Sequence, residues 1–270
     1  MSEPTELWEY VDVWWRSVGE FADLAASLPS EQWSTPTDLP GWDVRAVISH
    51  VAHLEGILGG APREDAEVLD APHLASPMSR FTEIGVLTRR EADPAAIVAE
   101  IRRYSAARHD ALLADPPTDP QAPAPGIFGA IGWSTATLLR NRPLDIAMHE
   151  QDVRRAVGRP GNIDGPGARH SATYLLESLG YVLAKRVKAP AGTTLAVYVE
   201  GHPPAAVTVD ESGRGTTLAE PVDPTVTLRM DRETFLLLAG GRRTDAAERV
   251  RIEGDDELAA RVLGALAVTP

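Results

Sequence analysis

The stretch that decides the fold is Arg142-Pro-Leu-Asp-Ile-Ala-Met-His-Glu-Gln-Asp152, which continues to Gly158. At the 100° per residue of an α-helix, one face of this stretch carries an apolar stripe that should be buried: Leu138, Ile146, Val153, Ala156 and Val157. Asp145 and His149 fall inside the stripe, and residues four apart on a helix are neighbours at about 6 Å. Burying polar groups without partners is costly, so this pair requires a bound ion, each other or a polar network.

A second predicted helix supplies another polar residue near a buried face. It begins after Asp43, a suitable N-cap, and ends at Gly59-Gly60. Its apolar stripe consists of Val44, Val47, Ile48, Val51, Leu54 and Leu58. His50 lies at the edge of that stripe, whereas His53 lies almost opposite its centre. We therefore expect His50 to reach the interior and His53 to meet water.

His50, Asp145 and His149 together offer two nitrogens and one oxygen, a donor set suited to zinc or another divalent transition ion. Helical bundles build metal centres from side chains on facing helices, and three protein ligands leave a coordination position open. Asp152 is a candidate to orient His149, and Arg142 is a candidate to pair with Asp145. No residue is assigned a catalytic role.

The alternative is that Asp145 and His149 form a hydrogen-bonded pair without an ion, with His50 half-exposed at the edge of the core. The spacing Asp-x-x-x-His is common in helices and does not decide between the two interpretations. The remaining histidines are expected to be solvated or structural: His53, His73, His109, His170 and His202.

Helical periodicity predicts four main helices, enough for a bundle around one core. They cover residues 7–28, 43–59, 93–112 and 134–157. The fourth contains Pro143, so it is either kinked there or begins there. A short helix is expected near 80–90, and the proline-rich segment 115–126 is expected to be a loop.

The pattern changes after Gly158-Arg-Pro-Gly161. One helix is predicted over 170–186, followed by short strands in which apolar residues alternate: Leu195, Val197 and Val199; Val207 and Val209; Val226, Leu228 and Met230; and 249–252. Two further helices are expected over 233–238 and 255–266. The sequence thus predicts a helical bundle over residues 1–160 and a small α+β domain over 161–270.

Composition narrows the classes of function. The formal net charge of −13 argues against nucleic acid and anionic membranes as partners. The 270 residues include no cysteine, which excludes disulfides, thiolate metal sites and a cysteine nucleophile. No signal-peptide pattern and no apolar run of about 18 residues is found. We expect a soluble, cytoplasmic protein, either a monomer or a homodimer, that acts on a small molecule.

Two motifs are recognisable together. They are Trp33-x-x-Pro-Thr-x-Leu-Pro-Gly-Trp42-x-Val-x-x-Val-Ile-x-His50 and Asp145-x-x-x-His149-Glu-Gln-Asp152-x-x-x-Ala156-x-Gly158. These resemble the mycothiol-dependent maleylpyruvate isomerase-like family of actinobacteria, a branch of the DinB-like four-helix metal proteins. The resemblance covers residues 5–160. The rest is more loosely similar to the family's C-terminal domain, which resembles sterol carrier protein type two.

The resemblance implies that His50, Asp145 and His149 hold a divalent ion, zinc in the isomerase, and that mycothiol is the co-substrate. The isomerase has a glutamate where this chain has Asp145, one methylene shorter. The function implied is a metal- and mycothiol-dependent isomerase or transferase acting on a small electrophile, of which maleylpyruvate is the nearest named case. Two alternatives stay open: a metal-dependent hydrolase that uses bound water, and a non-catalytic protein that binds a small ligand.

Overall fold

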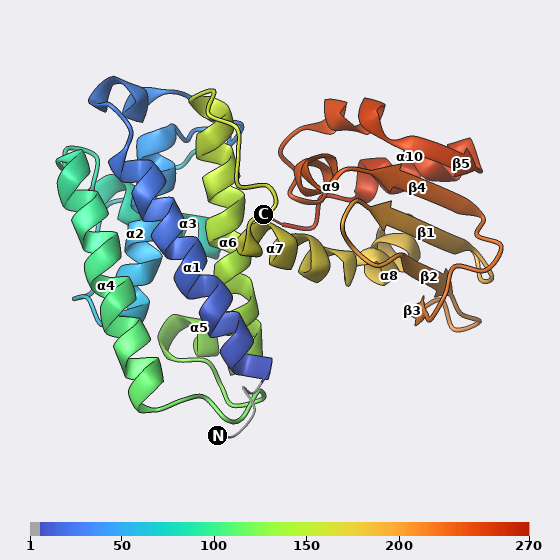
Figure 1. Ribbon diagram of the computed structural model, residues 1–270, viewed down its shortest axis with the longest axis horizontal. Coiled ribbons are helices and arrows are strands. Elements are labelled where there is room, and N and C mark those ends of the chain that lie inside the picture. The colour runs from blue at the N-terminus through green and yellow to red at the C-terminus, as the bar shows by residue number, and fades with distance from the viewer. Residues whose placement is uncertain (1–5, 270) are drawn as a thin grey trace. The chain divides into compact units, whose positions relative to one another are not determined.

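Four long helices form the first unit of the computed structural model, which describes residues 6–269. They are α1 (Glu6–Ala26), α2 (Val44–Leu58), α4 (Pro94–Ala114) and α6 (Thr135–Ala156) (Figure 1). Helices α1 and α2 each contact both α4 and α6, so the four close around one core. This unit ends at Asn162. The predicted four-helix bundle is confirmed.

Capping residues of the sequence set the helix starts. The Asp43 carboxylate accepts a hydrogen bond of 2.8 Å from the amide of Ala46 at the start of α2. Ser134 accepts one of 3.2 Å from the amide of Thr137 at the start of α6. Because α6 is capped there and continues through Pro143, the alternative in which the helix begins at Pro143 is wrong.

Apolar side chains from all four helices fill the bundle, among them the fully buried Trp14, Phe21, Ile48, Ile101 and Ile146. Three short elements cover it: η1 (Ser30–Ser34), α3 (Pro77–Thr88) and α5 (Gly126–Ala130). Helix α3 is the predicted short helix and packs on α2. The proline-rich segment forms neither a helix nor a strand over 115–125, as predicted, but its last residue, Gly126, begins α5.

The second unit, from Ile163 onward, contains a five-stranded sheet in the order β3-β2-β1-β4-β5. The strands are β1 (Thr194–Val199), β2 (Ala205–Val209), β3 (Gly215–Leu218), β4 (Val226–Met230) and β5 (Arg251–Gly254). Strands β1 and β4 are parallel, and the other neighbours are antiparallel. Leu195 is in register with both Val207 and Val226, so the predicted apolar rows share one face of the sheet.

The helices of this unit are α7 (Pro166–Leu176), α8 (Leu179–Tyr181), the π-helical η2 (Val182–Arg186), α9 (Arg232–Ala239), η3 (Thr244–Arg249) and α10 (Asp256–Ala265). Together with the sheet they confirm the predicted α+β character. None of the helices in residues 6–269 combines the length and the apolar character that crossing a membrane requires.

The single helix predicted over 170–186 is wrong in its bounds and its continuity. Helix α7 begins earlier, at Pro166, and the regular helix is interrupted at 177–178. There the Ser178 hydroxyl donates a 2.6 Å hydrogen bond to the carbonyl of Leu175. Just beyond the interruption, β3 approaches the helix so closely that a β-carbon on Gly215 would lie 2.0 Å from the Gly180 carbonyl oxygen. The interruption thus lies where the sheet meets the helix.

Gly85 sets the distance between α3 and α2. A β-carbon at this position would lie 2.2 Å from the β-carbon of His53, well inside van der Waals contact. A β-carbon added to Gly19, which also lies in a helix, would have no neighbouring atom within 4 Å.

We predict that Gly85→Ala lowers the free energy of unfolding by about 1–3 kcal/mol, because overpacking displaces α3 from α2. The matched substitution Gly19→Ala should raise it by up to about 1 kcal/mol, since alanine favours helix where there is room. Urea unfolding followed by circular dichroism measures both. Equal effects of the two substitutions would contradict this packing.

Candidate metal centre

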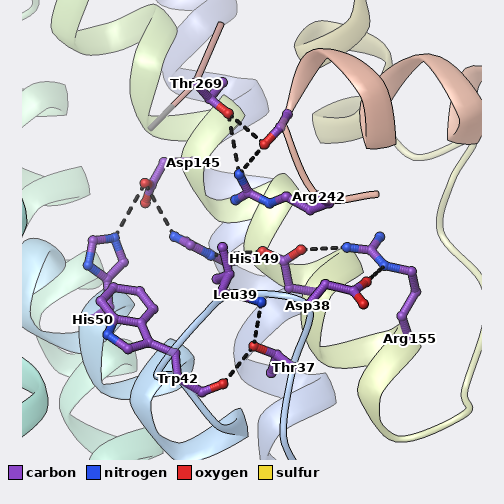
Figure 2. Close-up of polar contacts among 12 residues, drawn as sticks. Thr37, Asp38, Leu39, Trp42, His50, Asp145, His149, Arg155, Arg242 and Thr269 are labelled. Atoms are coloured by element: carbon purple, nitrogen blue, oxygen red, sulfur yellow. Dashed lines mark hydrogen bonds and ion pairs between the residues drawn. The ribbon is translucent and has the colours of Figure 1, made fainter. Parts of the chain in front are cut away.

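The structure brings His50, Asp145 and His149 together inside the bundle, His50 from α2 and the other two from α6 (Figure 2). The Nε2 atom of His50 lies 3.4 Å from Asp145 Oδ1, and Nε2 of His149 lies 3.6 Å from the same oxygen. The ligand atoms of all three lie within 4.8 Å of one another. Across residues 6–269, this is the one cluster of three such side chains with the spacing of a metal site.

Two of the three separations between the donors match those around a small divalent ion. Nitrogen and oxygen ligands about 2.0–2.2 Å from a tetrahedral zinc ion lie about 3.3–3.6 Å from one another. Both histidine–carboxylate separations, 3.4 and 3.6 Å, fall in that range. Both histidines are buried and Asp145 is partly buried, so the donors sit in a largely dry interior. Two imidazoles and one carboxylate also have the chemistry that zinc prefers.

Asp152 contacts His149 as the sequence suggested. Its Oδ2 lies 3.2 Å from His149 Nδ1, on the side of the ring away from Asp145. The other oxygen of this fully buried carboxylate accepts a hydrogen bond from Arg155, which also donates to Asp38 at 2.9 Å. A carboxylate on the second ring nitrogen fixes the orientation and tautomer of a ligating histidine.

Arg142 contacts the other face of Asp145. Its Nη1 donates a 2.8 Å hydrogen bond to Asp145 Oδ2, which leaves Oδ1 facing both histidines. The remaining guanidinium nitrogens donate to Glu55 Oε1 at 3.1 and 2.8 Å. Sequence reasoning missed Glu55. It lies four residues after Val51, in the apolar stripe of α2, so the argument that singled out Asp145 would have identified it too.

Trp42 packs against both histidines from the turn before α2. The centroid of its ring lies 5.1 Å from that of His50 and 6.0 Å from that of His149. Its indole nitrogen donates a 3.0 Å hydrogen bond to Glu83 on α3. The Nδ1 atom of His50 is buried without a hydrogen-bond partner, so the ring is held by packing against Trp42 and His149 and by the contact of Nε2 with Asp145. Trp33, the other tryptophan of the motif, is part of the bundle core.

Burial and neighbouring charges set the protonation of the three donors. Burial lowers the pKa of His50 to about 4, although the Asp145 carboxylate favours its protonated form. Burial also opposes ionisation of Asp145, but Arg142 and the two histidines hold its pKa well below the usual value. For His149, burial is outweighed by Asp145 and Asp152, which raise its pKa. Asp145 and His50 are therefore in the state that binds a metal at neutral pH, whereas the raised pKa of His149 makes metal binding compete with protonation of that ring.

The expectation that His53 meets water is wrong. His53 is buried, its Nδ1 lies 2.8 Å from Glu64 Oε2, and its ring contacts Phe81 of α3. The cause is tertiary: α3 packs over the face of α2 that points away from the bundle core, and periodicity within α2 does not reveal a second layer. The prediction that His53 is structural rather than a ligand of the cluster agrees with this position.

Two polar residues on the face of α6 opposite the apolar stripe, Glu150 and Gln151, are buried as well. Glu150 accepts hydrogen bonds from Arg154, at 2.8 Å, and from Asn162, at 3.0 Å. The side-chain amide of Gln151 donates to the carbonyl of Gly161 at 3.1 Å. The segment after α6 thus folds back along the helix and covers the polar face that sequence alone leaves open.

The fold and the cluster define a class of protein: a four-helix bundle with two histidines and a carboxylate gathered in its interior, followed by a small α+β domain. Residues 14–154 match the family model described as the mycothiol maleylpyruvate isomerase N-terminal domain. Residues 169–261 match the model for the C-terminal domain of the same family. The chain belongs to the mycothiol maleylpyruvate isomerase family, as its motifs indicated.

Solved structures agree on the fold. The mycothiol-dependent maleylpyruvate isomerase superposes with a TM-score of 0.56 at 16% identity, over 92% of this chain and 93% of that one. A histidine-to-alanine mutant of that enzyme gives the same values. At this identity the likeness concerns the fold alone. No curated protein matches the chain in sequence.

The contacts of Glu64 make the stability of the bundle depend on pH. Burial of this carboxylate opposes ionisation, but hydrogen bonds from His53 and Arg89 lower its pKa from 4.5 to about 2. Because the pKa is lower in the folded state, ionised Glu64 stabilises the fold above pH 4.5, and this contribution is lost as pH falls from 4.5 towards 2.

We therefore expect Glu64→Gln to be less stable than the wild type at pH 7, with the difference shrinking as pH falls from 4.5 towards 2. Glu67→Gln, which removes an exposed carboxylate of the same segment, is the control and should show no such trend. Denaturant unfolding at several pH values measures the differences. A Glu64→Gln difference that stays constant with pH would show that these hydrogen bonds do not shift its pKa.

Proposed function

We propose that this protein is a divalent-metal- and mycothiol-dependent enzyme in which His50, Asp145 and His149 hold one ion, with zinc as the preferred metal. The observation that carries the proposal is the position of Asp145 Oδ1, 3.4 and 3.6 Å from an imidazole nitrogen on each side. Family membership supports the use of mycothiol. A divalent ion at this position would lower the pKa of a bound thiol and supply a thiolate nucleophile near neutral pH.

Neighbouring side chains hold the three proposed ligands in place. Asp152 holds the ring of His149 by its far nitrogen, and Arg142 holds the far oxygen of Asp145. Trp42 packs against both imidazoles and restricts their movement. With no cysteine in the chain, the sulfur of a thiol-dependent reaction comes from the co-substrate.

The proposed reaction is isomerisation of, or thiol transfer to, a small electrophile. A thiolate that adds reversibly to an activated double bond allows rotation about the resulting single bond, and its loss restores the double bond in the other geometry. Maleylpyruvate is the nearest named substrate, because it is the substrate of the enzyme whose fold this chain shares.

We further propose that residues 1–160 and 161–270 form separate domains, with the three donors confined to the first. The two compact units and the two family matches support this division. The cytoplasmic location and the monomeric or homodimeric state stay predictions from the sequence.

Purified protein should carry one divalent ion per chain, measured by elemental analysis after zinc supplementation and gel filtration. We expect His149→Ala to lose the ion and His109→Ala to retain it, because His109 lies in α4 stacked on Trp15 and outside the cluster. Chelation should lower the melting temperature of the wild type by linkage. Full zinc occupancy in His149→Ala would refute the assignment.

The role of the thiol can be tested with cobalt in place of zinc. Adding mycothiol to the cobalt-loaded protein should produce the near-ultraviolet charge-transfer absorption of thiolate ligation. The absorption should develop at pH values well below the free thiol pKa of about 8.5. An analogue with a hydroxyl in place of the thiol should bind more weakly and give no such absorption. Equal binding of both compounds without that absorption would instead favour the hydrolase or ligand-binding alternative.

A further inference from the structure

A buried carboxylate that sequence reasoning missed lies behind the candidate ligands. Glu55, on α2, has no exposed surface. Its Oε1 accepts two hydrogen bonds from Arg142, at 3.1 and 2.8 Å, and its Oε2 accepts one of 3.1 Å from the indole nitrogen of Trp14. Arg108 Nη1 lies 3.9 Å from Oε2. One carboxylate therefore gathers an indole and two guanidinium groups in the centre of the bundle.

Arg142 connects this carboxylate to the metal cluster. Its Nε and Nη2 bind Glu55, and its Nη1 binds Asp145 Oδ2 at 2.8 Å. All three guanidinium nitrogens are thereby used, and the group is only 1% exposed. The chain of contacts runs from α1 and α4, through Glu55 on α2, to Asp145 on α6, so all four bundle helices contribute.

We infer that Glu55 is a positioning residue for the metal centre, acting through Arg142 on Asp145; this inference rests on the proposed metal-dependent function. Two physical effects support it. Glu55 fixes the guanidinium plane, which in turn fixes the Asp145 carboxylate with Oδ2 engaged and Oδ1 turned to both histidines. Glu55 also balances the charge of Arg142, which would otherwise repel a cation held by Asp145 in a poorly screened interior.

A purely structural role makes a different prediction. Removing one partner of a buried ion pair destabilises the fold, because it leaves a buried charge without its partner. Such a role would show itself in unfolding and leave metal affinity alone. Glu150 offers a matched comparison within the same unit: it too is a buried carboxylate bound to an arginine, Arg154 at 2.8 Å, but within residues 6–269 its side-chain hydrogen bonds come from Arg154 and Asn162 and not from the three donors or Arg142.

The test compares zinc affinity, measured by competition with a chromophoric chelator, in the full-length wild type, Glu55→Gln and Glu150→Gln. Circular dichroism and thermal melts report folding of each. Loss of an outer contact to a metal ligand typically weakens binding about 10–100-fold, and we expect that loss in Glu55→Gln. Glu150→Gln should lower the melting temperature but keep the wild-type dissociation constant.

A double-variant comparison tests the route through Arg142. In an Arg142→Met background, adding Glu55→Gln should leave zinc affinity unchanged, because the connecting guanidinium is already gone. If Glu55→Gln fails to fold, Arg142→Lys replaces it. A single ammonium cannot donate to both carboxylates in the same way, so zinc binding should weaken there as well.

The outcomes separate this inference from the function on which it rests. Wild-type zinc affinity in folded Glu55→Gln, or in Arg142→Lys where that variant replaces it, would overturn the positioning role while leaving the metal centre intact. An equal loss of affinity in Glu150→Gln would also overturn it, since buried carboxylates in general would then be responsible. A wild-type protein that binds no zinc would instead remove the proposed function itself.

Discussion

The interior of the bundle depends on how the Asp145 carboxylate is shared. One oxygen faces His50 and His149 at 3.4 and 3.6 Å, and the other accepts a 2.8 Å hydrogen bond from Arg142. A carboxylate withdrawn from water needs such partners, because its desolvation is costly. The same requirement extends along the chain of contacts: Arg142 needs Glu55, and Glu55 is satisfied by Trp14 and Arg142. Polar side chains of four helices are thereby committed to one arrangement.

The rest of the first unit keeps this arrangement rigid. Large apolar side chains such as Phe21, Ile48 and Ile146 fill the core around the polar chain. Side chains mounted on packed helices hold their geometry better than side chains on loops, which favours a preorganised binding site. Outside the core lies a second charged cluster, in which Arg89, directly after α3, binds Glu64 and Glu100. That cluster involves a histidine, His53, but serves packing between helices rather than the donor set.

Sequence patterns predicted the four main helices of the bundle and identified the three candidate donors. The N-cap at Asp43 predicted where α2 begins, and the apolar stripe of α6 pointed to Asp145 and His149 because polar residues stood where apolar ones belong. Glu55 is also a polar residue within an apolar stripe, so it could have been identified from the sequence by the same argument. The burial of His53 and Glu150 could not be predicted from the sequence. It depends on α3 and on the segment after α6, which fold over helix faces that a single helix leaves exposed. Likewise, the short polar strand β3 is defined by its pairing with β2, and the helix interruption lies beside the close approach of Gly215 to Gly180, neither of which a local pattern reveals.

The central claim is that His50 Nε2, Asp145 Oδ1 and His149 Nε2 are ligands of one ion. Crystals of the zinc-loaded protein, with diffraction data collected on both sides of the zinc absorption edge, test this most directly. We expect a single anomalous peak about 2.0–2.2 Å from each of the three atoms. A well-ordered crystal of zinc-supplemented protein with no peak among these side chains, or with its peak at His53 and Glu64 instead, would contradict it.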